Sequence, residues 1–262
     1  MNRSLRLLLV AIALMFLGAG CSTAHTARPL GKGRQAVHIS VGGPIAGVGE
    51  PSIPLPLITA TYKVGVTDRL DVYAGWHVLE TFINQGNFYF DLGASYYFLD
   101  QKGALPGVSG AFTLSPLINR ESGWASIDLQ ATFSWAFGPR ERHLIYVGFH
   151  NYFTPLVPEP TSAKIPYTFS PYLGAQVRLG KKRRFGLGGE IKWHRPWVDT
   201  NPSVLGYVAP GRQGAIAFVA GFTLYIGKDT KPAPEEPAPA QSLDPAAQPV
   251  EPSSAPASEE AS

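Results

Sequence analysis

The chain has 262 residues, of which only 16% are charged, whereas 28 are glycine and 11% are aromatic. Soluble globular domains carry about 25% charged residues, so the low charge fits a body whose outer wall meets lipid. The net charge is +3, but the basic residues lie in short turns and are not interleaved with aromatic residues, which argues against a nucleic-acid interface. The single cysteine, Cys21, excludes an intrachain disulfide.

The first 21 residues have the layout of an export signal. A short basic stretch (1–6) precedes an apolar stretch (7–17), and small residues at 18–20 stand directly before Cys21. This arrangement resembles a bacterial lipoprotein signal with its lipobox, although glycine occupies the position that is usually leucine. The resemblance implies cleavage before Cys21 and a covalent lipid on that residue, and Ser22 in place of aspartate implies export to the outer membrane. An ordinary signal, or an uncleaved helix, is the alternative.

The middle of the chain consists of segments in which apolar residues alternate with small or polar ones. This period of two residues is typical of strands and not of helices. In one such segment Ile216, Phe218 and Phe222 alternate with residues that are small or hydroxylated, apart from Val219. Ten strands are predicted, with eight to twelve as the range, at 35–42, 57–66, 70–78, 88–98, 108–114, 124–137, 144–152, 167–179, 185–193 and 215–226.

Two architectures produce this alternation. A soluble sandwich or lipocalin-like barrel would point the apolar residues inward, whereas a transmembrane barrel points them toward lipid. The apolar faces are nearly free of charge, and they carry the large aromatic residues Tyr62, Trp76, Tyr96, Trp135 and Trp193. The chain from about 35 to 227 therefore resembles bacterial outer-membrane β-barrel proteins. The resemblance implies an all-β fold, an antiparallel up-and-down transmembrane β-barrel of about ten strands.

The connections between the predicted strands alternate in length. Those at 67–69, 100–106, 138–142 and 180–184 are short, whereas those at 43–56, 80–87, 116–123, 154–166 and 195–213 are generally longer. Outer-membrane barrels have short periplasmic turns and long extracellular loops. This rule places both termini in the periplasm, where the lipid on Cys21 would enter the inner leaflet of the outer membrane.

The domain organisation follows from these patterns. Residues 1–20 are predicted as a lipoprotein signal peptide, 21–34 as a lipidated tether, 35–227 as the barrel and 228–262 as a tail rich in proline, alanine and glutamate. The tail has too few large apolar residues to offset the entropy of ordering and is predicted to be disordered. Outer-membrane lipids are predicted partners of the barrel, and peptidoglycan or a periplasmic protein is a candidate partner of the tail.

The predicted inward faces collect charges of both signs, and a narrow lumen of about ten strands would be largely filled by them. The predicted network comprises Lys63, Asp71, Asp91, Asp128, Arg178, Glu190 and Lys192. Buried charges require partners, so we expect these residues to pair across the lumen. The leading interpretation is a structural barrel or a narrow transport pore with a charge-lined lumen.

An enzyme is the second interpretation, a hydrolase or lipid-modifying protein with a site at the rim. A histidine near a carboxylate could activate water or a serine. The candidate catalytic residues are His77 with Glu80, His194 with Asp199, and His150. No metal site is predicted, since the histidines lie on separate strands, and no cofactor is expected besides the lipid on Cys21. An adhesion or scaffold protein that acts through its loops or tail is the third interpretation.

Overall fold

The computed structural model describes residues 27–47, 52–83, 88–118, 123–156, 167–180, 182–199 and 206–227. The predicted signal peptide, Cys21 and the tail 228–262 lie outside the described residues. No helix in the described part of the chain is long and apolar enough to cross a membrane.

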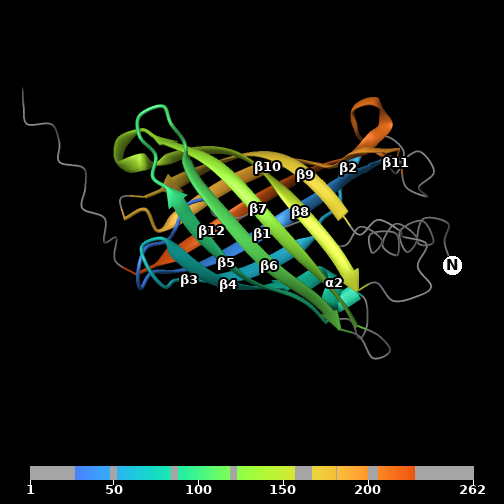
Figure 1. Cartoon of the computed structure of the whole chain (residues 1–262), viewed down its shortest axis with the longest axis horizontal. Helices are drawn as coiled ribbons and strands as arrows, with labels where there is room; N and C mark the ends of the chain where they lie inside the picture. The colour runs from blue at the N-terminus through green and yellow to red at the C-terminus, as the bar shows by residue number, and fades with distance from the viewer. Residues whose placement is uncertain are drawn as a thin grey trace, which may run out of the picture. The chain divides into compact units, whose positions relative to one another are not determined.

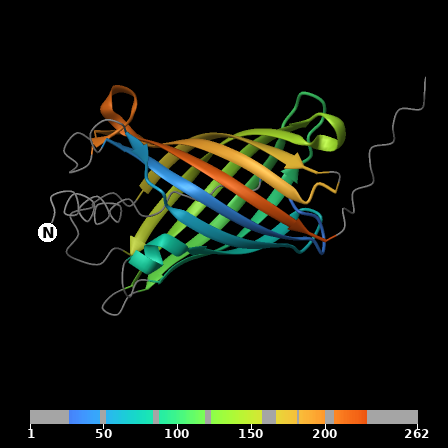
Figure 2. The ribbon, with the colours of Figure 1, turned by 180° about the vertical axis from the view of Figure 1, so that it is seen from behind.

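Ten antiparallel strands close into a barrel, as predicted (Figures 1 and 2). They are β1 (Gln35–Gly47), β3 (Ile58–Gly65), β4 (Leu70–His77), β5 (Phe88–Leu99), β6 (Gly107–Ile118), β7 (Gly123–Phe137), β8 (His143–Leu156), β9 (Tyr167–Leu179), β10 (Phe185–Asp199) and β12 (Gln213–Ile226). Each strand pairs with the next one around the barrel, and β1 closes it by pairing with both β3 and β12. Gln35 of β1, for example, lies opposite Val64 on one side and Ile226 on the other.

The large apolar side chains face outward, as the transmembrane interpretation requires. In β12 Phe218 is 46% exposed, whereas its neighbours Ala217 and Val219 are fully buried inside. The indole groups on the wall donate hydrogen bonds near the barrel ends, Trp135 to the Ala104 carbonyl and Trp193 to the Gln213 carbonyl. Aromatic residues with a polar group at each end of an apolar band are typical of membrane-spanning barrels.

The two ends of the barrel differ in their connections (Figure 1). We call the end with the hairpins after β3, β5, β7 and β9 the turn end; β1 begins there and β12 ends there. The opposite end, which we call the loop end, carries α2 (Val78–Ile83) and the two-residue strands β2 (Ile53–Pro54) and β11 (Gly206–Tyr207), both paired with β1. Two 3-10 helices complete the described elements, η2 (Pro139–Glu141) at the turn end and η3 (Pro210–Arg212) at the loop end.

Several strands extend further toward the loop end than predicted. β10 was expected to end at Trp193, but it continues to Asp199 after a shift of register beyond His194. Beyond the apolar band of the wall, apolar and polar residues no longer alternate, although the strands remain hydrogen-bonded to their neighbours. The sequence pattern therefore underestimates the strand length. The helix α2 was not predicted, because six residues are too few to show a helical period.

Candidate functional site: the filled lumen, its N-terminal segment and a groove in the wall

The predicted lumen charges do point inward. Lys63, Asp71, Asp91, Asp128, Glu190 and Lys192 are all buried. Arg178 is half-buried, and its guanidinium carbon lies 4.7 Å from the centre of the Tyr225 ring. The lumen is therefore lined by charged groups that have protein partners and little contact with solvent.

The main network joins β7, β8 and β10. Lys192 Nζ lies 3.3 Å from Glu190 Oε2 and 3.4 Å from His150 Nε2. The other ring nitrogen of His150 lies 2.7 Å from Asp128 Oδ2, and the Tyr146 hydroxyl donates to Glu190 Oε1 over 2.9 Å. Lys192 and Glu190 compensate each other's charge, and His150 bridges Lys192 to Asp128. Tyr146 was not predicted as a member, since the stagger between strands decides which inward side chains meet.

A second network lies near the loop end, where His77 ends β4. His77 Nε2 lies 3.0 Å from Asp91 Oδ2, and its Nδ1 lies 3.6 Å from Glu80 Oε1 on α2. The Ser115 hydroxyl donates to Asp91 Oδ1 over 2.6 Å, and the Tyr89 ring stacks on the imidazole at 3.9 Å. The structure thus brings the predicted pair His77 and Glu80 together. Both imidazole nitrogens face carboxylates, so neither is placed to accept a proton from a nucleophile.

The other predicted pair is not brought together. His194 is buried in the lumen, whereas Asp199 is exposed at the loop end. His194 Nδ1 instead lies 2.9 Å from the hydroxyl of Ser170, which is also buried. Ser170 alternates with apolar residues in the sequence and was expected to point inward, but its contact with His194 depends on the register between β9 and β10.

The residues that precede β1 cross the mouth of the barrel at the turn end. We call residues 27–34 the N-terminal segment. Ala27 is buried against Leu144, Tyr146 and Tyr172, which belong to the inward faces of β8 and β9. These residues were predicted as part of a tether, and their sequence gives little sign of burial, because Ala27 and Leu30 are the only apolar side chains among them apart from proline.

Hydrogen bonds fix the N-terminal segment to several parts of the wall. The Leu30 amide donates to both carboxylate oxygens of Asp71 at 3.1 and 3.2 Å, and Lys63 Nζ lies 3.1 Å from the same carboxylate. Ser109 Oγ donates to the Ala27 carbonyl over 3.2 Å. At Gly65 a side chain is excluded, since a Cβ atom there would lie 2.0 Å from a carbonyl oxygen of the segment. The segment is thus an integral part of the barrel mouth.

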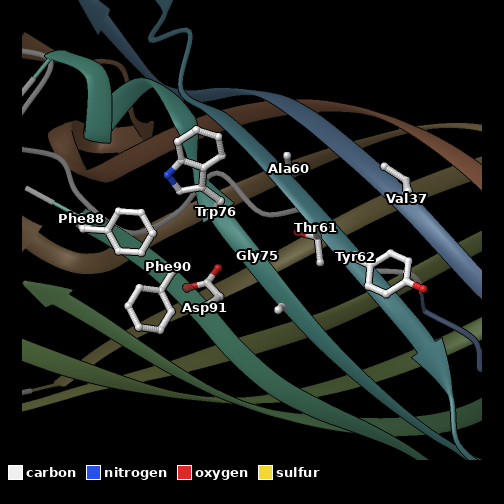
Figure 3. A pocket seen from close by; sticks show the side chains of 10 residues that line it. Val37, Ala60, Thr61, Tyr62, Gly75, Trp76, Phe88, Phe90 and Asp91 are labelled. Atoms are coloured by element: carbon white, nitrogen blue, oxygen red, sulfur yellow. The ribbon is translucent and has the colours of Figure 1, made fainter.

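A groove of about 380 Å³ lies in the outer wall across β3, β4 and β5 (Figure 3). Trp76 and Phe88 flank one side of it and Tyr62 the other, with Ala60 between them. Ala74 also lines the groove. The depression arises because alanine replaces the larger apolar residues that cover the rest of the wall. Most of its lining surface is apolar, and Thr61 and Asp91 are its polar lining residues. The groove therefore mainly offers contacts to hydrocarbon.

Comparisons with known proteins return outer-membrane proteins among the solved structures, all at low similarity. No protein-family model and no curated protein matches the sequence. Among solved structures, OmpT of Vibrio cholerae, described as an outer membrane protein, is 11% identical over 65% of this chain and 56% of that chain, with a TM-score of 0.30. OpdQ of Pseudomonas aeruginosa is 12% identical over 72% of this chain and 61% of that chain, with a TM-score of 0.30. The chain thus spans less than two thirds of the length of these two structures.

A third structure, the attachment invasion locus protein Ail of Yersinia pestis, is 7% identical over 74% of this chain and 99% of that chain, with a TM-score of 0.24. All three similarities are too low to carry an argument about activity.

Proposed function

We propose that the protein is a lipid-anchored outer-membrane barrel that is closed at rest and has a structural role. The observation that carries this proposal is the set of buried, paired charges in the lumen together with the N-terminal segment at its mouth. Buried ion pairs occupy its interior, and the N-terminal segment lies across its turn-end mouth, tied to the wall through Asp71. A pore that conducts at rest needs a hydrated path, and side chains that bond to each other leave little room for one.

The proposed orientation places the turn end in the periplasm. The longer connections lie at the opposite end, as in barrels whose long loops are extracellular. Six positions separate Cys21 from Ala27, and an extended chain spans at most about 3.5 Å per residue. A lipid on Cys21 would therefore lie within about 20 Å of the barrel mouth, which is close enough for its acyl chains to enter the surrounding leaflet.

Single-channel conductance in a planar bilayer tests the closed state. The full-length protein should insert, shift its gel mobility on heating and show no discrete current steps. Reproducible steps from the wild-type protein would contradict the proposal and favour the narrow-pore alternative. In that case neutral variants of Lys63, Asp128 and Glu190 should change the conductance.

Mass spectrometry of the protein purified from membranes tests the proposed anchor separately. A mature chain that begins at Cys21 with added acyl mass is expected. A Cys21→Ser variant should lack that mass and serves as the control. A mature chain that begins elsewhere and carries no acyl mass would contradict the proposed lipid anchor. It would not contradict the proposed closed barrel.

A hydrolase remains the second candidate because one serine hydroxyl contacts a histidine in the lumen. In the contact between Ser170 and His194 the other imidazole nitrogen, Nε2, is buried without a hydrogen-bond partner. A serine beside an imidazole is the minimum arrangement for nucleophilic catalysis. Turnover of acyl esters that disappears in a normally folded His194→Ala variant, and persists in His38→Ala, would favour this candidate.

A further inference from the structure

The turn end carries a strong excess of positive charge. Its segments, residues 27–34, 65–70, 99–107, 138–143 and 179–185, contain eleven lysines and arginines but three acidic residues. The connections at the loop end, residues 47–57, 78–88, 118–124, 154–166 and 195–213, contain four basic and five acidic residues. The charge is therefore concentrated at one end of the barrel.

The three acidic residues of the turn end are already engaged there. Asp100 pairs with Arg69 at 2.8 Å, Glu141 pairs with Arg28 at 3.0 Å, and Asp68 accepts a hydrogen bond from the Lys32 amide at 3.1 Å. Asp100 and Glu141 are thus paired with arginines other than Arg184. Lys102, Lys182 and Arg184 are exposed, and no ion pair joins them to an acid in the described part of the chain.

These three cations lie next to the exposed apolar residues at the turn end of the wall. Lys102 follows Leu99 and precedes Leu105, which are 61% and 68% exposed, and Arg184 directly precedes Phe185, which is 45% exposed. Exposed leucine and phenylalanine side chains at the end of a transmembrane barrel wall lie at the edge of the hydrocarbon, so the cations next to them lie at the height of the lipid headgroups. Long basic side chains reach this layer with their charged groups while their stems contact apolar surface.

We propose that Lys102, Lys182 and Arg184 form a basic collar that binds the phosphate groups of anionic phospholipids in the leaflet around the turn end. The excess of positive charge complements the negative headgroups, and the adjacent apolar wall accommodates their acyl chains. Two cations lie on the hairpin between β9 and β10 and one on the hairpin between β5 and β6, so the collar contacts several lipids of one leaflet. The inference requires a membrane-spanning barrel but is independent of the closed lumen.

Electron spin resonance of spin-labelled lipids tests the collar. The full-length protein is reconstituted in phosphatidylcholine vesicles, and the association of labelled phosphatidylglycerol is measured relative to labelled phosphatidylcholine. The wild-type protein should prefer phosphatidylglycerol. Each cation removed should reduce that preference by up to about fivefold, since one lysine or arginine near an anionic surface contributes about that factor. The triple variant Lys102→Gln, Lys182→Gln, Arg184→Gln should lose most of this preference.

The matched control is Arg212→Gln, which removes an exposed cation at the loop end. It should retain the wild-type selectivity, whereas Lys102→Gln should lose part of it. Inorganic phosphate and chloride at equal ionic strength should reduce the selectivity equally through screening. A larger loss in phosphate would identify free phosphate as the ligand and overturn the proposal. Undiminished selectivity in a triple variant that retains its heat-dependent gel mobility would also overturn it.

Discussion

Ile191 and Lys192 are neighbours in β10, yet they meet opposite surroundings. Lys192 is fully buried among the charged groups of the lumen, whereas Ile191 is 49% exposed on the outer wall. In a soluble barrel the positions of these two residues would be reversed. The comparison shows that the two faces of one strand meet different requirements. A lumen charge such as Lys192 needs a charged partner, whereas a wall residue such as Ile191 must suit hydrocarbon.

The two faces should therefore respond differently to substitution. A change in the lumen disturbs a network of specific partners, so its effect depends on which group is left unpaired. A change on the wall disturbs contact with lipid, so its effect depends on depth in the bilayer. Unfolding in urea from lipid vesicles, measured as a free energy, can separate these two dependences.

The largest effect is expected when Lys192 loses its charge. A Lys192→Met substitution leaves Glu190 buried without its cation, at the position where Nζ now lies 3.3 Å from Oε2. Breaking a buried ion pair in this way costs about 3–5 kcal/mol of unfolding free energy. The double variant Lys192→Met, Glu190→Gln should recover much of the loss. A single variant as stable as the wild-type protein would mean that the lumen network is solvated.

A charge placed on the wall should have the next largest effect. Leu173 lies at the centre of β9 and is 52% exposed, so a Leu173→Arg substitution places a cation near the bilayer midplane. The expected loss is about 2–4 kcal/mol at the midplane and about 0–1 kcal/mol near the interface. Leu105→Arg, in the hairpin between β5 and β6, is the matched control. Equal losses at both positions would contradict the proposed placement of the apolar band.

The sequence predicts the faces better than it predicts the contacts. Alternation with period two correctly places Lys63, Asp128 and Glu190 inside, because each strand has one fixed orientation toward the lumen. It cannot pair Asp71 with the backbone amide of Leu30, since that contact depends on how the N-terminal segment enters the mouth. Alternation also does not predict the register shift between His194 and Asp199, beyond which Asp199 is exposed at the loop end.

Two glycines, one on each face of the wall, should differ in how well they tolerate an added methyl group. At Gly148, on the lumen side of β8, a Cβ atom would lie 2.2 Å from the Ala131 carbonyl oxygen and 2.4 Å from the Tyr172 hydroxyl. At Gly189, on the wall side of β10, the nearest atom would be 3.7 Å away. Gly148→Ala should therefore cost about 1–3 kcal/mol through overpacking, whereas Gly189→Ala should change the unfolding free energy little. The reverse order would show that the lumen has unfilled space beside Tyr172.

The smallest effect is expected for an ion pair outside both faces. Arg69 and Asp100 are 2.8 Å apart at the turn end, but their side chains are 49% and 58% exposed, whereas the Lys63–Asp71 pair is buried. A double-mutant cycle with Arg69→Gln and Asp100→Asn should give a coupling energy of about 0–1 kcal/mol, which falls as salt is added. The same cycle with Lys63→Gln and Asp71→Asn should give a larger coupling energy that salt changes little, since the surrounding protein excludes ions from the pair. A salt-sensitive Lys63–Asp71 coupling would mean that water and ions reach the lumen past the N-terminal segment, and the mouth would then be open.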